Sequence, residues 1–318
     1  MTRVLRFITR RLLAMIAVIW VIVTVVFFLA HASPYDPIKL LAGAKANGNP
    51  LAVQRLRHFY GLDQPVWQQY TNYLGSLVHG NLGYSEGADS LGQPVWSILQ
   101  LGVPVSLRLG GYALVLALIV GLPVGLVSAL RQNTIVDHAG QSIMISLYAV
   151  PSFVLVPICQ LVFGAQLKWL PVTGWGDTGL LGLKEMVLPV TLYAAGLAGY
   201  FAVSFRSFLL EVLRQDYIRT ARAKGLKNRV IVYVHATKNT LLPLASIVGP
   251  TVAFLITGAF VIEFFFGIPG IGYITITSLT ESNYPIIEGT TILLVTFVVL
   301  VNMLTDIVYA LIDPRIGL

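Results

Sequence analysis

The chain has 318 residues, of which 56% are hydrophobic and 11% are charged, and its mean hydropathy is +0.78. Soluble domains carry about 25% charged residues, because polar side chains must cover their surface. The composition therefore excludes an ordinary soluble protein and indicates a chain that faces lipid. The net charge of +7 does not indicate nucleic-acid binding, because Arg and Lys cluster between apolar runs and not on one face of a domain.

The N-terminal segment is basic and is followed by the apolar run Leu12–Ala30. This run is longer than the apolar core of a signal peptide, and Ala30-His31-Ala32 is a weak cleavage site, so we expect a retained first helix. Cys159 is the single cysteine, which excludes an intrachain disulfide and a thiolate metal cluster within one chain.

Six segments are long and apolar enough to cross a membrane. About 20 helical residues span the hydrocarbon core of about 30 Å, at a rise of about 1.5 Å per residue. None of the six contains Asp, Glu, Lys or Arg. We predict an all-α membrane protein with six transmembrane helices, at Leu12–Ala30, Leu109–Leu130, Ala139–Phe163, Met186–Phe205, Leu241–Ile262 and Gly289–Thr305.

Basic residues predict the orientation of these helices, because short flanks rich in Arg and Lys stay in the cytoplasm. Four arginines precede the first helix and Arg131 follows the second, while the loop after the fourth holds eight basic residues against two acidic ones. We predict a multi-pass protein of the plasma (inner) membrane with both termini cytoplasmic. The eight basic residues are Arg206, Arg214, Arg219, Arg222, Lys224, Lys227, Arg229 and Lys238.

The chain is predicted to have three parts. Residues 1–30 contain the N-terminal segment and the first helix, residues 31–108 form an external insertion, and residues 109–318 form the core domain with helices two to six. The insertion is rich in Pro, Gly, Tyr and Trp, which indicates short helices and turns. The core domain includes a cytoplasmic loop at residues 206–240.

The spans lack the ionisable group that transport driven by an ion gradient usually needs inside the bundle. Glu263 and Asp306 lie near helix ends, where we expect them at interfaces or in structural pairs. A G-x-x-x-x-G-K-[ST] nucleotide loop is also absent, because the sequence contains no Gly-Lys pair. Energy for any transport would therefore come from another polypeptide.

Prolines and polar residues inside the spans leave two interpretations open. The prolines are packing kinks, or they free backbone groups beside a wet cavity. The polar residues line a path or bond across helices. The prolines are Pro123, Pro151, Pro157, Pro189 and Pro250, and the polar residues are Ser146, Tyr148, Ser152, Gln160, Thr191, Tyr193, Ser204, Thr251 and Thr257.

The loop after the fourth helix is too long and too regular for a simple connector, since connections in bundles take about 2–8 residues. A helical pattern from Glu211 to Lys224 is followed by Gly225, which can adopt the positive φ that ends a helix, and a second pattern starts at Asn228. We predict two short helices at an angle that dock into a partner. Anchoring to lipid phosphates is the alternative that charge alone favours.

The residue order of this loop is Asp216-Tyr217-Ile218-Arg219-Thr220-Ala221-Arg222-Ala223-Lys224-Gly225-Leu226, then His235-Ala236, Asn239 and Leu242-Pro243. It resembles the coupling loop of ABC importer permeases, in the form found in dipeptide and oligopeptide permeases. The general pattern is Glu-Ala-Ala, three residues, then Gly, of which Ala221 and Gly225 match. The longer interval from Gly to Pro fits the peptide branch. The resemblance implies a coupling site at Asp216, Arg219, Ala221, Ala223, Gly225, Leu226 and Pro243.

Other segments resemble the first (B-type) permease subunit of the same branch, so that the similarity covers nearly the whole chain. They lie in the insertion, after the fifth helix and near the C-terminus. These segments are Gly61-Leu62-Asp63-Gln64-Pro65, Gly80-Asn81-Leu82-Gly83-Tyr84-Ser85, Gln93-Pro94-Val95, Glu263–Gly272, Asn283-Tyr284-Pro285 and Ala310–Arg315.

The resemblance implies a transport subunit that is not itself an enzyme and binds no cofactor. ATP and Mg²⁺ would sit on two partner ABC ATPase subunits, or on one fused ATPase, and their closure would push the coupling loop. A second homologous permease subunit would complete a heterodimer in the lipid bilayer. An extracytoplasmic binding protein would deliver short peptides to the external face, and the insertion is expected to meet this protein or the second permease.

Three alternatives differ in substrate or in class. A related permease would carry a nickel complex or another small solute. A rhomboid-like protease would need a Ser nucleophile in a Gly-x-Ser-x-Gly-like turn and an intramembrane His, and the five histidines lie outside or at the ends of the spans. An energy-independent channel would work without ATPases. Scattered histidines also give no metal-binding pattern.

Overall fold

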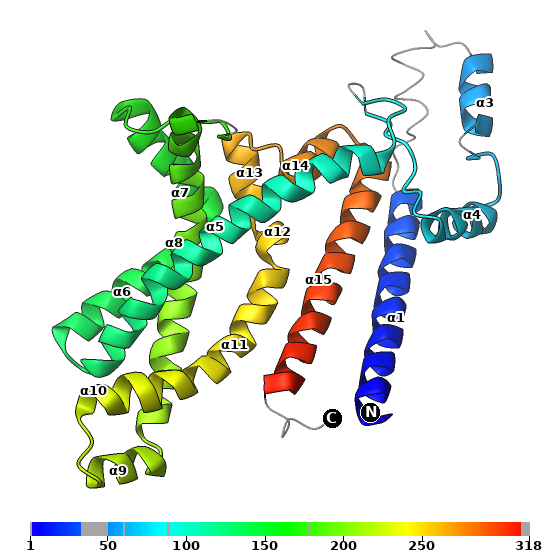
Figure 1. The fold of residues 1–318 in the computed structure, drawn as a ribbon. Coiled ribbons are helices and arrows are strands. Elements are labelled where there is room, and N and C mark those ends of the chain that lie inside the picture. Colours follow the sequence, from blue (N-terminus) through cyan, green and yellow to red (C-terminus); the bar gives the residue numbers. More distant parts are fainter. Residues whose placement is uncertain (1, 33–49, 60, 88–89, 177–178, 313–318) are drawn as a thin grey trace. The chain divides into compact units, whose positions relative to one another are not determined.

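The computed structural model describes residues 2–32, 50–59, 61–87, 90–176 and 179–312. In these residues the structure is helical, with one isolated bridge between Tyr84 and Pro94 (Figure 1). Part of the predicted insertion, residues 33–49, and residues 313–318 with Arg315 lie outside the described residues. The chain divides into two compact units, one of residues 1–105 and 269–318, the other of residues 106–268.

The first unit contains two long helices that lie side by side, α1 (Thr2–Ala32) and α15 (Tyr284–Ile312) (Figure 1). Arg11 of α1 forms an ion pair of 2.8 Å with Asp306 of α15. Asp306 therefore makes the structural pair predicted for it. The unit also contains α3 (Pro50–Phe59), α4 (Val66–Val78), the start of α5 (Val95–Leu130) and α14 (Ile271–Thr280).

Asn283 joins two sequence motifs of the first unit that lie about 200 residues apart. Its side-chain oxygen accepts a hydrogen bond from the backbone N–H of Glu86 at 3.1 Å, and its amide nitrogen donates to Ser85 Oγ at 2.8 Å. Asn283 and Ser85 are both buried. Ser85 and Glu86 are thus fixed to the residue that precedes α15.

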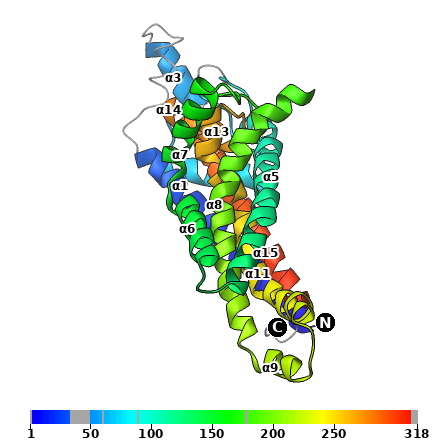
Figure 2. The same cartoon turned by 90° about the vertical axis from the view of Figure 1, so that its left-hand side faces the viewer.

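The second unit is built around α8 (Gly179–Leu213), which lies beside α6 (Ile135–Ala149) (Figure 2). Its other helices are the rest of α5, α7 (Ser152–Cys159), η1 (Gln160–Gln166), α9 (Asp216–Ala223), α10 (Asn228–Val230), η2 (Ile231–Ala236), α11 (Thr237–Ala253), α12 (Leu255–Gly258) and α13 (Phe260–Phe266).

Small residues bring the helix backbones of the second unit close together. A Cβ placed on Gly121 of α5 would lie 2.7 Å from the carbonyl oxygen of Ala198, and a Cβ on Gly125 would lie 2.6 Å from that of Ala202. A Cβ on Gly199 of α8 would meet the carbonyl of Met144 in α6. Such contacts allow dense van der Waals packing, which is the main attraction between helices in lipid.

Four helices of the described residues are long and apolar enough to cross a membrane, and up to six spans result if each of two bent helix pairs is one span. The pair α6 and α7–η1 is bent by 99°, and the pair α10–α11 and α12–α13 by 51°. Val150, before Pro151, has an extended backbone (φ −74°, ψ 121°), because the proline ring disfavours helical geometry in the preceding residue. Pro151 therefore breaks the third predicted span, while Pro157, Pro189 and Pro250 lie inside helices.

Two helices extend past the predicted boundaries. α5 begins at Val95, within the segment assigned to the insertion, and α8 continues to Leu213, beyond the predicted end at Phe205. The predicted spans exclude charged residues and therefore stop next to Arg108 and Arg206. Arginine, however, is a good helix former and does not end a helix. Part of the predicted loop 206–240 is therefore an extension of a membrane helix.

Glu263 of α13 is fully buried and accepts a hydrogen bond of 2.6 Å from Ser106 Oγ of α5. Both residues belong to the second unit. A buried carboxylate needs such partners, because an isolated charge in an apolar interior is costly. The bond supports the interpretation of Glu263 as a structural residue.

We predict that Gly125→Ala weakens the contact between α5 and α8. The new methyl group would meet the backbone of Ala202, which cannot turn away as a side chain could. Overpacking of this kind costs about 1–3 kcal/mol. The temperature at which the purified chain loses its monodisperse peak in detergent measures the effect.

Gly111→Ala is the matched control, because a Cβ on Gly111 in the same helix meets nothing within 4 Å. It should melt at or above the wild-type temperature, since Ala favours helix over Gly by about 1 kcal/mol. Equal melting temperatures for the two variants would contradict the close packing.

Candidate functional site

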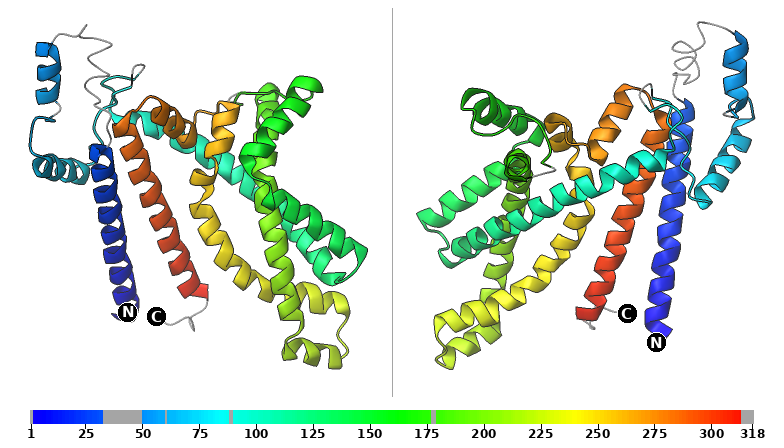
Figure 3. Two further views of the ribbon diagram at one scale, coloured as in Figure 1. Left: turned by 180° about the vertical axis from the view of Figure 1, so that it is seen from behind. Right: turned by 45° about the horizontal axis from the view of Figure 1, so that its top comes forward.

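The chain turns sharply after α8 and forms an elbow that consists of α9, α10 and the turns around them, residues 214–230 (Figure 3). Gly225 has φ +73°, as the sequence predicts for a helix-ending glycine. Its N–H donates to the carbonyl of Arg222 at 3.0 Å, and Leu226 N–H donates to that of Ala221 at 3.3 Å. These bonds close the end of α9, and α10 then begins at Asn228.

One face of α9 is anchored in the core of the second unit. Ile218 is fully buried and Ala221 is 8% exposed, and both belong to the cluster that contains Leu209 of α8 and Ile231 of η2. Tyr217 Oη accepts a hydrogen bond of 3.0 Å from the side chain of Asn239. α9 is therefore fixed to the helices on both sides of it.

The other face of α9 is exposed. Asp216 and Arg219 form an exposed ion pair of 3.3 Å one turn apart, and Ala223, Gly225 and Leu226 are exposed as well. Pairs of this kind contribute little to stability, so these side chains are available to a partner.

The predicted site residues do not form one continuous patch. Ala221 supports the exposed face from inside the core. Pro243 lies inside α11, more than a turn after its start at Thr237, and is half-buried. We therefore assign Pro243 to the following helix and not to the exposed face of α9.

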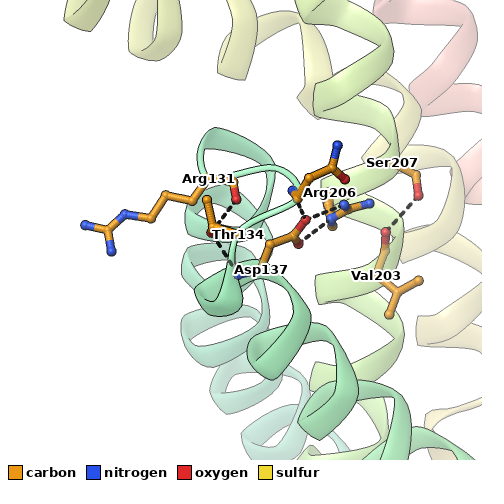
Figure 4. A network of polar contacts seen from close by, with 7 residues as sticks. Arg131, Thr134, Asp137, Val203, Arg206 and Ser207 are labelled. Carbon is orange, nitrogen blue, oxygen red and sulfur yellow. Dashed lines mark hydrogen bonds and ion pairs between the residues drawn. The ribbon is translucent and has the colours of Figure 1, made fainter.

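Asp137 and Arg206 form an ion pair that connects the start of α6 to α8 (Figure 4). Arg206 Nε and Nη2 donate to the two carboxylate oxygens of Asp137 at 2.7 and 2.6 Å. Asn133 N–H donates to the same carboxylate at 2.9 Å, and Thr134 Oγ1 accepts from Asp137 N–H at 3.4 Å. A two-point contact of this type is strong and directional.

This pair was not predicted from the sequence. The Asp137 side chain is 1% exposed, while Arg206 was counted among the loop charges. A local signal existed, because Thr134-x-x-Asp137 has the spacing of a helix-capping motif. The partner on α8 could not be inferred, since it lies 69 positions away.

The second unit also contains a pocket of about 720 Å³ beside the bend at Pro151. Sites for small molecules usually have about 300–1,000 Å³. None of its lining residues is Asp, Glu, Lys, Arg or His. They are Leu147, Tyr148, Val150, Pro151, Ser152, Leu155, Leu192, Tyr193, Gly196, Leu197, Tyr200, Ser246, Ile247, Pro250, Thr251, Phe254 and Ile262.

The structure gives examples of both interpretations of the polar residues inside the predicted spans. Tyr148, Ser152, Tyr193 and Thr251 line the pocket, and Tyr148 stacks on Tyr200 with ring centroids 5.7 Å apart. Of these, Tyr193 also donates to the carbonyl of Leu255 and Thr251 to that of Ile247, each at 2.7 Å. Two polar residues outside the pocket bond to backbone groups as well. Gln160 donates to the carbonyls of Val172 and Phe265, and Thr191 donates within α8.

Neither region contains a set of metal ligands. In the described part of the chain, no group of three or more His, Cys, Asp or Glu residues could hold a metal ion. The pocket presents hydroxyl groups and apolar surface, and the elbow presents charges and a rigid turn. The first suits an uncharged or internally neutral ligand, and the second suits a protein surface.

Comparison with known proteins identifies relatives along the whole chain. Residues 121–318 match the family model of the binding-protein-dependent transport system inner membrane component, and residues 4–100 match the N-terminal model of such membrane components. The chain is 38% identical to the dipeptide transport system permease protein DppB of Bacillus subtilis over 314 residues, 98% of each chain. It is 36% identical to the oligopeptide transport system permease protein OppB of Salmonella typhimurium, over 98% of this chain and 99% of that protein.

A solved structure supports the fold. The chain resembles a chain of the inward-facing MetNI methionine ABC transporter with a TM-score of 0.57 and 19% identity, over 70% of this chain and 99% of that one. This likeness concerns the fold alone. Together, the two sequence matches confirm the predicted resemblance, and the chain belongs to the family of binding-protein-dependent transport system inner membrane components.

Proposed function

We propose that this chain is the transmembrane permease subunit of an ATP-driven importer of short peptides and that its elbow receives the motion of separate ATPase subunits. The observation that carries the proposal is that α9 is anchored by one face and exposed on the other. Its buried face, at Ile218 and Ala221, is part of the core, while its polar face is exposed. A helix arranged in this way transmits force without changing its own shape.

The topology that goes with this function has six spans, in which each bent helix pair counts as one. The termini and the elbow then lie in the cytoplasm, and the insertion at residues 31–108 lies outside the plasma (inner) membrane. The abundance of Arg and Lys in the elbow supports this orientation. The core domain would be residues 109–318, with the helical start of α5 added from residue 95.

The proposed partners follow from the division of tasks. A second homologous permease subunit completes the path, and two ABC ATPase subunits, or one fused ATPase, bind ATP and Mg²⁺. An extracytoplasmic binding protein delivers the substrate to the insertion. The names of the relatives from B. subtilis and S. typhimurium support peptides as the substrate class.

The proposed mechanism runs from the elbow to the pocket through packed helices. A push on α9 moves α8, because Ile218 is packed in the same cluster as Leu209. α8 carries α6 with it, because Arg206 and Asp137 join them. α6 ends beside Pro151, which lines the pocket, so the pocket walls move when the elbow moves.

The pocket suits the path for a peptide because its lining is neutral. Hydroxyl groups of Tyr148, Ser152 and Thr251 can bond to peptide amides, and apolar neighbours tolerate different side chains. A lining without charge does not select one side-chain charge over another. Such a path is compatible with a substrate class of varied sequence.

Uptake by the reconstituted complex tests the substrate class. We expect proteoliposomes with the complete complex, its binding protein and internal ATP to accumulate labelled di- to pentapeptides. The same vesicles without ATP should accumulate none, because the six predicted apolar segments contain no Asp, Glu, Lys or Arg for ion coupling. Uptake of a nickel complex with no uptake of any peptide would contradict a peptide substrate and assign the nickel complex instead. Peptide uptake by this chain without the ATPase subunits would indicate an energy-independent channel.

We predict that Gly225→Val uncouples the complex. Valine in the left-handed region costs about 1–2 kcal/mol, so the turn after α9 would rearrange, although no atom blocks the new side chain. ATP-driven peptide uptake should fall at least tenfold.

Gly225→Asn is the matched control, because Asn adopts positive φ more readily than other residues. It should retain most of the uptake. Loss of uptake in both variants would show that coupling requires a residue without a side chain at position 225 and does not depend on positive φ alone. Full uptake with Val would refute a role of this turn in coupling.

We predict that Arg206→Gln raises the number of ATP molecules hydrolysed per peptide imported. The variant loses the two-point contact and leaves the Asp137 carboxylate without its charged partner, at a cost of about 1–3 kcal/mol. α8 would then move without carrying α6 fully along.

Arg131→Gln controls for charge at the same end of the helices, because the Arg131 side chain is exposed and points away from Asp137 (Figure 4). It should leave the ratio of ATP to peptide unchanged. If Arg206→Gln makes the protein less stable but keeps the wild-type ratio, the pair has a structural role only.

A further inference from the structure

Helix α4 lies beside the C-terminal part of α1 in the first unit (Figure 1), and Gln69, Tyr70 and Tyr73 of α4 contact it. Aromatic rings form most of the contact. Phe27 stacks on Tyr73 with centroids 5.3 Å apart, and Phe28 stacks on Tyr70 at 5.6 Å. Phe27 is 3% exposed, so the two helices form a tight joint.

The contact fixes the depth of α4 along α1. The apolar stretch of α1 runs over Thr9–Leu29, and these 21 residues are about as long as the hydrocarbon core is thick. α4 touches α1 between Thr24 and His31. Thr24 lies about 7 Å inside the end of the apolar stretch, at about 1.5 Å per residue, and His31 lies beyond it. α4 is therefore level with the edge of the hydrocarbon.

Two hydrogen bonds fix how α4 is rotated about its own axis. His31 Nε2 lies 2.9 Å from Gln69 Oε1, and Thr24 Oγ1 lies 2.7 Å from Tyr70 Oη. On the surface of α4, Gln69 therefore faces the end of α1, and Tyr70 faces a point further into its apolar stretch. Rotation around the α4 axis from Gln69 to Tyr70 leads deeper along α1. This direction is the same whichever side of the membrane the end of α1 faces.

The residues that come next in this direction are apolar. Successive helical residues are about 100° apart, which places Leu74, Trp67 and Val78 about 40–80° beyond Tyr70. Trp67 is 68% exposed and Val78 is 85% exposed. Asn72 lies on the opposite flank and is exposed. α4 contains no Asp, Glu, Lys or Arg.

We propose that α4 lies in the membrane interface, with Trp67, Leu74 and Val78 turned toward the acyl chains and Asn72 turned toward water. The occupant of the exposed apolar flank is the lipid bilayer. Trp favours this region because its ring is apolar and its N–H is polar. A helix without charge, apolar on the deep flank and polar on the other, fits a position in the interface plane.

Nitroxide labels test the proposal position by position. Cys159 is replaced by Ser, and Trp67→Cys, Val78→Cys and Asn72→Cys are each introduced and labelled in the full-length chain. The chain is reconstituted in vesicles of phosphatidylcholine and phosphatidylglycerol. Relaxation by oxygen, which partitions into hydrocarbon, is compared with relaxation by a water-soluble nickel chelate. Trp20→Cys on the apolar stretch of α1, where Trp20 is 54% exposed, is the lipid reference.

We expect the ratio of oxygen to nickel effects at positions 67 and 78 to approach that at position 20 and to exceed the ratio at position 72 severalfold. Ratios at 67 and 78 equal to that at 72 would place α4 in water and overturn the proposal. Immobile labels shielded from both reagents would show a protein partner on this flank and would also overturn it. If Trp67→Cys fails to fold, position 78 alone decides, because it lies on the same flank.

Discussion

The packing of α8 against α5 and α6 is the constraint on which the second unit depends. Gly121, Gly125 and Gly199 let the helix backbones touch, where any Cβ would collide with a carbonyl oxygen. Lipid tails are as apolar as leucine, so close packing must replace the hydrophobic effect between such helices. The ion pair between Arg206 and Asp137 adds a directional contact at one end of α6. The proposed mechanical coupling requires these three helices to move together, and such contacts would hold them to one another.

The bend at Pro151 and the pocket beside it have a common cause. A broken helix frees backbone groups, and a membrane tolerates them only where protein or a wet cavity satisfies them. Elsewhere in the unit Gln160 satisfies backbone outside regular helix hydrogen bonding, because its side-chain amide donates to the carbonyl of Val172, after η1, and to that of Phe265, at the end of α13, at 2.8 and 2.9 Å. The irregular backbone of the bend, at Val150 and Pro151, lines the pocket. A pocket at this position is therefore the expected companion of the break.

The elbow could be predicted from local sequence patterns, but contacts between residues far apart in the sequence could not. Gly225 follows a helical pattern, and one glycine suffices to end it, so its positive φ could be predicted. Composition likewise located the apolar segments. The 99° bend could not be predicted, because a proline in a helix permits either a kink or a break and the neighbouring helices decide. The pairing of Asp137 with Arg206 depends on how α6 lies against α8, which no local pattern encodes.

The distribution of charge explains how such a chain could release its substrate. A short peptide is zwitterionic, and fixed charges in the pocket would hold its termini strongly in a medium of low dielectric. The lining residues carry no charge, so in the proposed mechanism a peptide in the pocket would be bound weakly and the barrier for its release would stay low. In the proposed complex, capture then belongs to the binding protein and energy to the ATPases. In the proposed mechanism, the chain contributes a packed connection from Ile218 to Pro151, and the exposed charged residues of the elbow face water and not the pocket.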